Sequence, residues 1–195
     1  QSPHFLNRCD EIGLLVFEEI PGWQHIGDED WKAISLRDIE AMIVRDRNHP
    51  SIFAWGLCNE IGGQNPPAYN FAKRMLEEAK KLDQHRLCSY ASNSLQKTPD
   101  KDVSRLMDFI EWNEYYESWY PGTPETLRQN LEEIHRAFPD KPIVISEYGY
   151  CACKADRPEG DARRIEIFHD HNRIFREIEA VGGLIFFCYN DYRTH

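Results

Sequence analysis

The chain has 195 residues, and its 33 acidic and 23 basic side chains give a formal net charge of −10 at pH 7. Because phosphate binding depends on basic residues, this balance argues against a nucleic-acid partner. The longest apolar stretches, residues 12–17 and 182–189, are far shorter than the roughly 20 residues that cross a bilayer, so no membrane partner is expected. Hydrophobic residues make up 41% of the chain, which is enough for the core of a single domain.

Short runs of β-branched and aromatic residues alternate with amphipathic segments, which is the pattern of a parallel sheet with crossover helices. The strand-like runs are Leu14 to Glu19, Ile52 to Asn59, Arg86 to Tyr90, Phe109 to Asn113, Ile143 to Glu147 and Leu184 to Tyr189. The helical segments are Asp30 to Asp46, Pro67 to Leu82, Pro124 to Phe138 and Arg163 to Val181. The chain also begins within a helical pattern, and the third helical segment has Thr123 as a cap before Pro124. Residues 91–107 are loop-like in composition.

Polar residues gather where these strand-like runs end. They are Glu18, Glu19, Asn59, Glu60, Trp112, Asn113, Glu147, Tyr148, Asn190 and Asp191. Parallel α/β barrels build their active sites at this end, and open doubly wound sheets also bind ligands there. No glycine-rich nucleotide loop follows any of the runs, so a barrel is favoured.

A TIM (β/α)8-type barrel has eight strands in about 250 residues. Six runs in 195 residues therefore predict an α/β barrel that is truncated at its N-terminus, with two βα units before Gln1. No linker divides the chain, so we expect residues 1–195 to form a single catalytic barrel domain. Strand edges left open by the truncation favour self-association, so a homo-oligomer is expected.

The six cysteines are Cys9, Cys58, Cys88, Cys151, Cys153 and Cys188. They lie mostly in apolar runs, which indicates buried thiols and favours a cytoplasmic protein, although a signal peptide before Gln1 would make a periplasmic or secreted protein. The spacing of Cys151 and Cys153 is too short for a zinc knuckle, and His169 and His171 do not share a helix face. We therefore expect no metal site.

Two glutamates that end different strands, Glu60 and Glu147, are the strongest candidates for catalysis. Glycoside hydrolysis needs two carboxyl groups in one cleft, one protonated to donate to the leaving oxygen and one ionised to attack or to direct water. Close approach of two carboxylates, or burial, raises the pKa of one and so divides these roles. The alternative is that each glutamate caps a helix or pairs with an arginine.

The segments around both glutamates resemble glycoside hydrolase family 2, which contains β-galactosidases, β-glucuronidases and β-mannosidases. The motifs that carry the resemblance are FLNRCDEIGLLV at 5–16, VRDRNHPSI at 44–52, WGLCNE at 55–60, SEYG at 146–149 and GGLIF at 182–186. They stand in the family's order and extend over nearly the whole chain. The resemblance implies a carbohydrate substrate, no cofactor, and a retaining exo-β-glycosidase that hydrolyses terminal β-galactosides or β-glucuronides.

Carried over to this sequence, the resemblance implies that Glu60 is the general acid/base and Glu147 the nucleophile. A retaining mechanism requires their carboxyl groups to lie about 5 to 5.5 Å apart. Asn59 would hydrogen-bond the sugar 2-hydroxyl, a contact that strengthens in the transition state.

The segment after the fourth strand-like run resembles the family's sugar-lining segment. It supplies Asn113, Tyr115, Trp119 and Tyr120 as substrate-binding residues, and the Tyr115 hydroxyl would hold the nucleophile. Phe187 stands where relatives place a tryptophan under the sugar. Packing in a core is the alternative for the aromatic residues of this segment.

Two further hypotheses stay open. The chain is a catalytically incompetent fragment or sugar-binding module if the missing strands, and the β-sandwich domains that precede the family's barrel, are needed for activity. A metal-dependent hydrolase using Glu18, Glu19 and His25 has suitable residue types but lacks a known ligand spacing. The residues present do not decide which sugar is bound.

Overall fold

The computed structural model of the chain describes residues 1–151 and 160–190, so the predicted features at Cys153 and Asp191 lie outside it. The elements in chain order are α1 (Pro3–Ile12), β1 (Val16–Glu19), α2 (Glu29–Asp46), β2 (Ile52–Asn59), α3 (Pro66–Leu82), β3 (Leu87–Ser92), the 3-10 helices η1 (Pro99–Lys101) and η2 (Val103–Leu106), β4 (Ile110–Glu114), α4 (Pro124–Ala137), β5 (Ile143–Tyr148), α5 (Gly160–Glu177) and β6 (Val181–Phe186).

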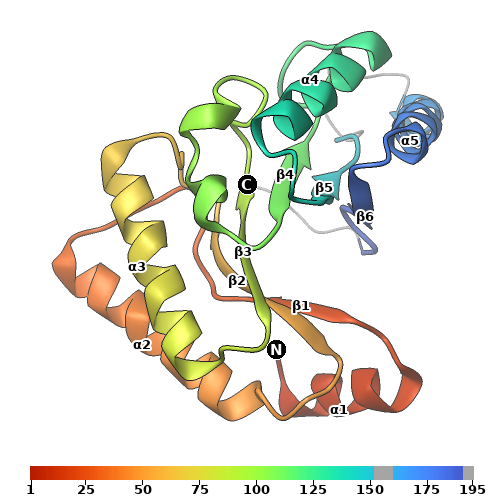
Figure 1. Ribbon diagram of the computed structural model, residues 1–195. Coiled ribbons are helices and arrows are strands. Elements are labelled where there is room, and N and C mark those ends of the chain that lie inside the picture. The colour runs from red at the N-terminus through yellow and green to blue at the C-terminus, as the bar shows by residue number, and fades with distance from the viewer. Residues whose placement is uncertain (152–159, 191–195) are drawn as a thin grey trace.

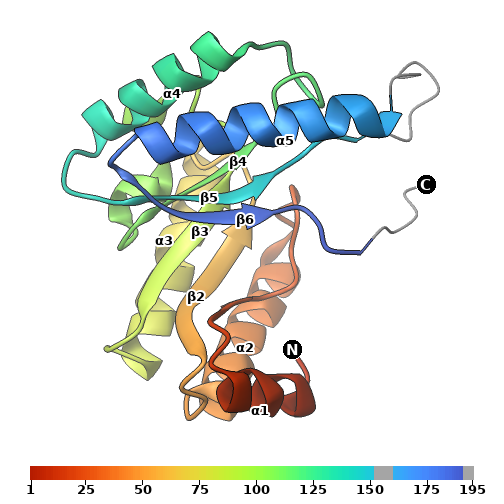
Figure 2. The same ribbon diagram turned by 90° about the vertical axis from the view of Figure 1, so that its right-hand side faces the viewer.

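All six strands form one parallel sheet in the order β1-β2-β3-β4-β5-β6. The sheet is curled, and the helices α2, α3, α4 and α5 lie around its outer side (Figures 1 and 2). Consecutive parallel strands joined by helices on the outer side are the construction of a TIM barrel. The predicted fold class is therefore confirmed, with six barrel strands present and β1 and β6 at the edges of the described sheet.

Local start and stop signals account for the helix ends. The Thr123 side chain accepts a hydrogen bond from the Thr126 amide at the start of α4, as the cap prediction requires. The helical pattern at the beginning of the chain is α1, whose Ser2 cap accepts a hydrogen bond from Phe5 and whose last residue is followed by Gly13 in the left-handed conformation. Residues 91–107 are not entirely loop, because they contain η1 and η2.

The prediction for the last strand was wrong in position. It runs over Val181–Phe186 rather than 184–189, and α5 ends at Glu177. Pairing with β5 decides this register, since Val181 lies opposite Ile143 and Gly183 opposite Val144. A side chain on Gly183 would press against the Val144 side chain, so glycine permits the close approach despite its low strand propensity.

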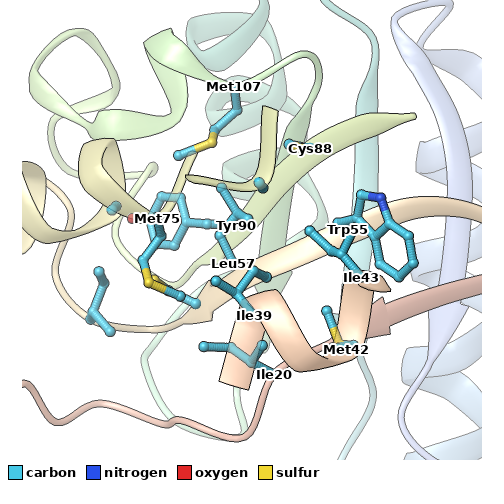
Figure 3. Close-up of a cluster of buried hydrophobic side chains, with 14 of the residues drawn as sticks. Ile20, Ile39, Met42, Ile43, Trp55, Leu57, Met75, Cys88, Tyr90 and Met107 are labelled. Atoms are coloured by element: carbon cyan, nitrogen blue, oxygen red, sulfur yellow. The ribbon is translucent and has the colours of Figure 1, made fainter. Parts of the chain in front are cut away.

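Two buried hydrophobic clusters hold the helices against the outer face of the sheet. The first, shown in Figure 3, joins β1 to β3 with α1, α2, α3 and η2 through residues such as Ile39, Leu57 and Met75. The second joins β4 to β6 with α4 and α5 through residues such as Leu131 and Phe175. These clusters leave the strand ends free to carry polar groups.

The prediction of buried thiols is confirmed for three of the five described cysteines, whereas Cys151 and Cys188 are half-buried. Cys9, Cys58 and Cys88 are buried thiols, and burial raises the pKa of Cys88 to about 12. Among the described residues, no helix is long and apolar enough to span a membrane.

Candidate active site

The carboxyl ends of β2, β4 and β5 bring the predicted catalytic pair to one end of the sheet. Glu147 lies within β5. Glu60 directly follows β2, and its amide donates to the Ala91 carbonyl at 2.8 Å. The backbone of Glu60 is left-handed, with φ of 55°, a conformation that non-glycine residues adopt mainly where the surroundings impose it.

The Glu60 carboxylate accepts three hydrogen bonds. Asn113 Nδ2 lies 3.0 Å from Oε1, and Trp23 Nε1 and Gln24 Nε2 each lie 2.9 Å from Oε2. The loop that carries Trp23 and Gln24 is attached to the end of β2, because the Gln24 amide donates to the Asn59 carbonyl at 3.1 Å. Neither residue was predicted, although both follow β1 and so obey the strand-end rule that selected Glu60.

The Glu147 carboxylate accepts a hydrogen bond from the Tyr115 hydroxyl at 2.7 Å. Asn113 of β4 connects the end of β2 to β5. Its amide nitrogen lies 3.0 Å from Asn59 Oδ1 and also donates to Glu60, and both of these acceptors are at the end of β2. Its oxygen accepts from the Ser146 hydroxyl at 2.7 Å. Asn59, Asn113 and Tyr115 are thus placed together with both glutamates, whereas Ser146 was predicted only as part of a motif.

The pKa of Glu147 is raised by burial and by a neighbouring charge and lowered by hydrogen bonds. Burial is the largest effect and raises its pKa, and the negative charge of Glu60 raises it further. The hydrogen bond from Tyr115 lowers it, as do polar contacts with Asn113 and Asn59. The two carboxyl groups are therefore close enough to influence each other electrostatically.

Two more carboxyl groups lie beside the pair. Burial, followed by the charges of Glu147 and Glu60, raises the pKa of Glu19 to about 8. Burial also raises the pKa of Glu111 well above its ordinary value, and neither oxygen of Glu111 has a hydrogen-bond partner among the described residues. Burial thus disfavours the charged form of both groups, and Glu19 is mostly neutral at pH 7.

Glu18 and Glu19 point to opposite faces of β1. Glu18 is buried on the outer face within 3.8 Å of Arg45 from α2, whereas Glu19 is on the inner face against Gly56. In the described part of the chain, no group of three metal-ligating side chains comes together. The three-residue metal hypothesis with His25 therefore has no support there.

The predicted aromatic residues take different positions. The Tyr120 hydroxyl donates to Glu114 Oε1 at 2.9 Å and accepts from the Tyr115 amide at 3.1 Å. Trp119 is 59% exposed, with its ring centroid 6.4 Å from that of Tyr115. Phe187, 39% exposed, directly follows β6. The packing alternative holds for the neighbouring Trp112 and Tyr116, which are buried in the second cluster.

The curled parallel sheet with paired carboxyl groups at its strand ends defines a barrel of the glycoside hydrolase type. The family model described as "Glycosyl hydrolases family 2, TIM barrel domain" matches residues 1–174. The chain belongs to this family.

Named relatives of the chain fall into two groups. It is 36% identical over 199 residues to a beta-galactosidase of Thermoanaerobacterium thermosulfurigenes, covering 100% of this chain and 26% of the relative. It is 30% identical over 223 residues to a beta-glucuronidase of Streptococcus agalactiae, covering 100% of this chain and 37% of the relative. The chain thus spans only about a quarter to a third of these curated relatives.

Solved structures share this fold. A beta-glucuronidase from Ruminococcus gnavus in complex with D-glucuronic acid superposes with a TM-score of 0.87 at 26% identity, over 99% of this chain and 35% of that one. The beta-D-glucuronidase of Dictyoglomus thermophilum superposes with a TM-score of 0.86 at 24% identity, over 100% of this chain and 37% of that one.

Proposed function

We propose that this chain is the single catalytic barrel domain of a retaining exo-β-glycosidase that hydrolyses terminal β-galactosides or β-glucuronides. The observation that carries the proposal is the pair of glutamates at the carboxyl ends of β2 and β5. Residues at the end of β4 hydrogen-bond both of them. Asn113 donates to Glu60 at 3.0 Å and Tyr115 donates to Glu147 at 2.7 Å. Membership of glycoside hydrolase family 2 supports the reaction class.

In the proposed double displacement, a Glu147 oxygen attacks the anomeric carbon while Glu60 gives its proton to the departing glycosidic oxygen. This forms a covalent bond between the sugar and Glu147. Water then attacks the same carbon, Glu60 takes the proton from the water, and the bond to Glu147 breaks. The proposal requires a separation of about 5 to 5.5 Å between the two carboxyl groups, which stays a prediction.

The remaining predicted residues have supporting roles in this proposal. Asn59 hydrogen-bonds the sugar 2-hydroxyl, and that bond becomes stronger as positive charge develops on the ring. Trp119, Tyr120 and Phe187 line the sugar and aglycone positions. The proposed reaction needs only Glu60, Glu147, these supporting side chains and water.

Trapping of the covalent intermediate tests the proposal. The protein is incubated with 2-deoxy-2-fluoro β-galactoside and β-glucuronide reagents, its intact mass is measured, and circular dichroism confirms folding. We expect an adduct that maps to Glu147, and the reagent that reacts identifies the sugar. The Glu147→Gln variant should form no adduct, whereas Glu133→Gln, which changes an exposed glutamate on α4, should react like the unaltered protein.

The outcome separates the two hypotheses left by the sequence. An adduct at another residue contradicts the assignment of Glu147 as the nucleophile. A folded protein that forms no adduct with either reagent contradicts the proposed activity of this chain. The sugar-binding or incompetent-fragment hypothesis would then be preferred, and binding of galactose or glucuronic acid by calorimetry would test it.

A further inference from the structure

We propose that Glu114 and His171 are positioning residues. The buried pair that they form holds residues 114–120, which we call the Tyr115 segment, and thereby keeps the Tyr115 hydroxyl on Glu147. This inference rests on the proposed function of Glu147 as the nucleophile. Neither Glu114 nor His171 is among the residues predicted from the sequence.

The pair lies between the sheet and α5, away from solvent. Glu114 is the last residue of β4, His171 lies in the middle of α5, and both are fully buried. His171 Nε2 contacts Glu114 Oε2, and His171 Nδ1 lies 2.8 Å from the Ile167 carbonyl oxygen. Because a carbonyl oxygen only accepts, Nδ1 carries a hydrogen and donates it to Ile167.

Aromatic rings enclose the imidazole of His171. The Tyr116 ring stacks on it with a centroid distance of 4.4 Å and an interplanar angle of 9°, and the Tyr148 ring lies at 5.8 Å. Water therefore has no ready access to replace either partner. The orientation of Glu114 is consequently determined by α5.

A continuous series of hydrogen bonds runs from this pair to Glu147. Glu114 Oε1 accepts from the Tyr116 amide at 3.0 Å and from the Tyr120 hydroxyl at 2.9 Å. The Tyr120 hydroxyl in turn accepts from the Tyr115 amide at 3.1 Å. Tyr115 then donates its own hydroxyl to Glu147 at 2.7 Å.

The helix α5 holds the Tyr115 segment at a second point. Arg163 donates from Nε and Nη2 to the two carboxylate oxygens of Glu117, whose backbone is left-handed with φ of 62°. The Ser118 hydroxyl accepts from the Cys151 amide at 3.1 Å. A segment held at both its beginning and its middle has little freedom to move Tyr115.

Stability alone gives little reason for such a pair. Removing two ionisable groups from water is costly, and apolar residues of similar volume often replace a buried ion pair without loss of stability. Apolar residues would not accept the two hydrogen bonds from Tyr116 and Tyr120, however. The acceptor oxygen of Glu114 is thus the feature that an apolar pair lacks.

Three variants of the intact protein separate positioning from packing. Tyr120→Phe removes the hydroxyl that connects Glu114 to Tyr115. The double variant Glu114→Leu with His171→Phe removes the acceptor and avoids an unpaired buried charge. Glu114→Gln keeps an oxygen for Tyr116 and Tyr120, and its amide group can donate to His171 Nε2.

We expect Tyr120→Phe and the double variant to lower kcat and the trapping rate at Glu147 by about 10- to 100-fold, because small misplacements of reacting groups cost rates of this order. Their KM should change little, since both variants keep the Tyr120 ring that lines the sugar, or replace it by the similar ring of phenylalanine, and the lost interaction orients the nucleophile. Glu114→Gln should rescue the rate to within about threefold of the unaltered protein. Arg128→Gln, which breaks the partly exposed ion pair of α4 with Glu177 of α5, is the control and should have no effect.

Amide hydrogen exchange at Tyr115 gives a readout that does not need turnover. Its amide should exchange faster in Tyr120→Phe and in the double variant, and remain protected in Glu114→Gln. If the unaltered protein traps no sugar, the proposed function fails. If the exchange rate of the Tyr115 amide is then also the same in all variants, the positioning role is overturned as well. If trapping at Glu147 occurs and Tyr120→Phe and the double variant trap at the normal rate, only the positioning role is overturned.

Discussion

At the scale of single residues, the site contains carboxyl groups whose charged forms are disfavoured by burial and by each other. Glu147 and Glu19 are both shifted toward the neutral form by burial and by neighbouring carboxylates. Only Glu147 receives the Tyr115 hydroxyl at 2.7 Å, which favours its charged form. This contact distinguishes the proposed nucleophile from its neighbour.

The Tyr115→Phe variant tests that distinction. Loss of the hydroxyl removes a hydrogen bond that lowers the pKa of Glu147, so this pKa should rise. A hydrogen bond to a charged group corresponds to about one pKa unit or somewhat more. The acidic limb of the profile of kcat/KM against pH, which reports groups of the free enzyme, should therefore move to higher pH. Tyr69→Phe on α3 is the control, and an unmoved limb in Tyr115→Phe would contradict the assignment.

The Glu19→Gln variant should change how stability depends on pH. The pKa of Glu19 rises from 4.5 to about 8 on folding, so between these values the unfolded chain binds fewer protons than the folded one. The free energy of unfolding of the unaltered protein therefore falls as the pH rises. Glutamine does not titrate, so the Glu19→Gln variant lacks this fall. We expect the free energy of unfolding of Glu19→Gln, relative to the unaltered protein, to increase from pH 5 to pH 8 by up to about 1.4 kcal/mol per pH unit. Urea unfolding at both pH values measures it, and a constant difference would contradict the burial of this carboxyl group.

At the scale of elements, the end of the sheet opposite the site is held by one arginine before β3. Arg86 donates from Nε to the Ile52 carbonyl at 2.7 Å, from Nη2 to the His49 carbonyl at 2.9 Å and from Nη1 to Asp83 at 2.8 Å. Its guanidinium lies 5.5 Å from the centroid of the Trp55 ring. The beginning of β2 and the end of α3 thus meet at a single side chain.

Replacement of this side chain by lysine should weaken the junction. Arg86→Lys keeps the charge but cannot reach three acceptors in a planar arrangement, so the free energy of unfolding should fall by about 2 kcal/mol. Activity should persist, because the change lies at the other end of the strands. Lys73→Gln, which breaks an exposed pair with Glu77, is the control and should cost less than about 0.5 kcal/mol. Equal losses in both variants would show that Arg86 does not join these elements.

At the scale of the whole molecule, the sheet joins two separately packed halves. The first cluster serves β1 to β3 and the second serves β4 to β6. Between them, β3 and β4 share only the registered pairs Ala91 with Glu111 and Ser92 with Trp112, whereas β4 and β5 share pairs from Ile110 to Glu114. The seam between the halves is therefore the shortest ladder of the sheet.

Core substitutions should consequently act on one half more than on the other. Leu131→Ala in the second cluster should destabilise by about 2 to 5 kcal/mol and accelerate amide exchange mainly in β4, β5, α4 and α5. Met75→Ala in the first cluster should do the same in β2, β3, α2 and α3. Exchange measured by mass spectrometry checks both variants. Equal acceleration across the whole sheet in each variant would indicate one cooperative core instead.

Much of the fold and part of the site follow from local sequence patterns. Alternation of apolar runs with amphipathic segments predicted five of the six strands and four helices to within a few residues, because that periodicity reflects which face of each element is buried. The strand-end position of Glu60 and Glu147, with the motifs around them, predicted the candidate catalytic pair. Tyr115, Asn59 and Asn113 followed from the same motifs, and the structure places all three beside the pair.

What the sequence alone determined was thus the element order and the family resemblance, and it also predicted the two candidate carboxylates. The tertiary structure decided the register of β6, since pairing with β5 places the glycines where a local pattern does not. It also decided which donors reach Glu60, because Gln24 takes a left-handed backbone with φ of 57° that its sequence does not signal. The pairing of Glu114 with His171 is of the same kind. These residues are 57 positions apart, and only the packing of α5 against the sheet brings their side chains into contact.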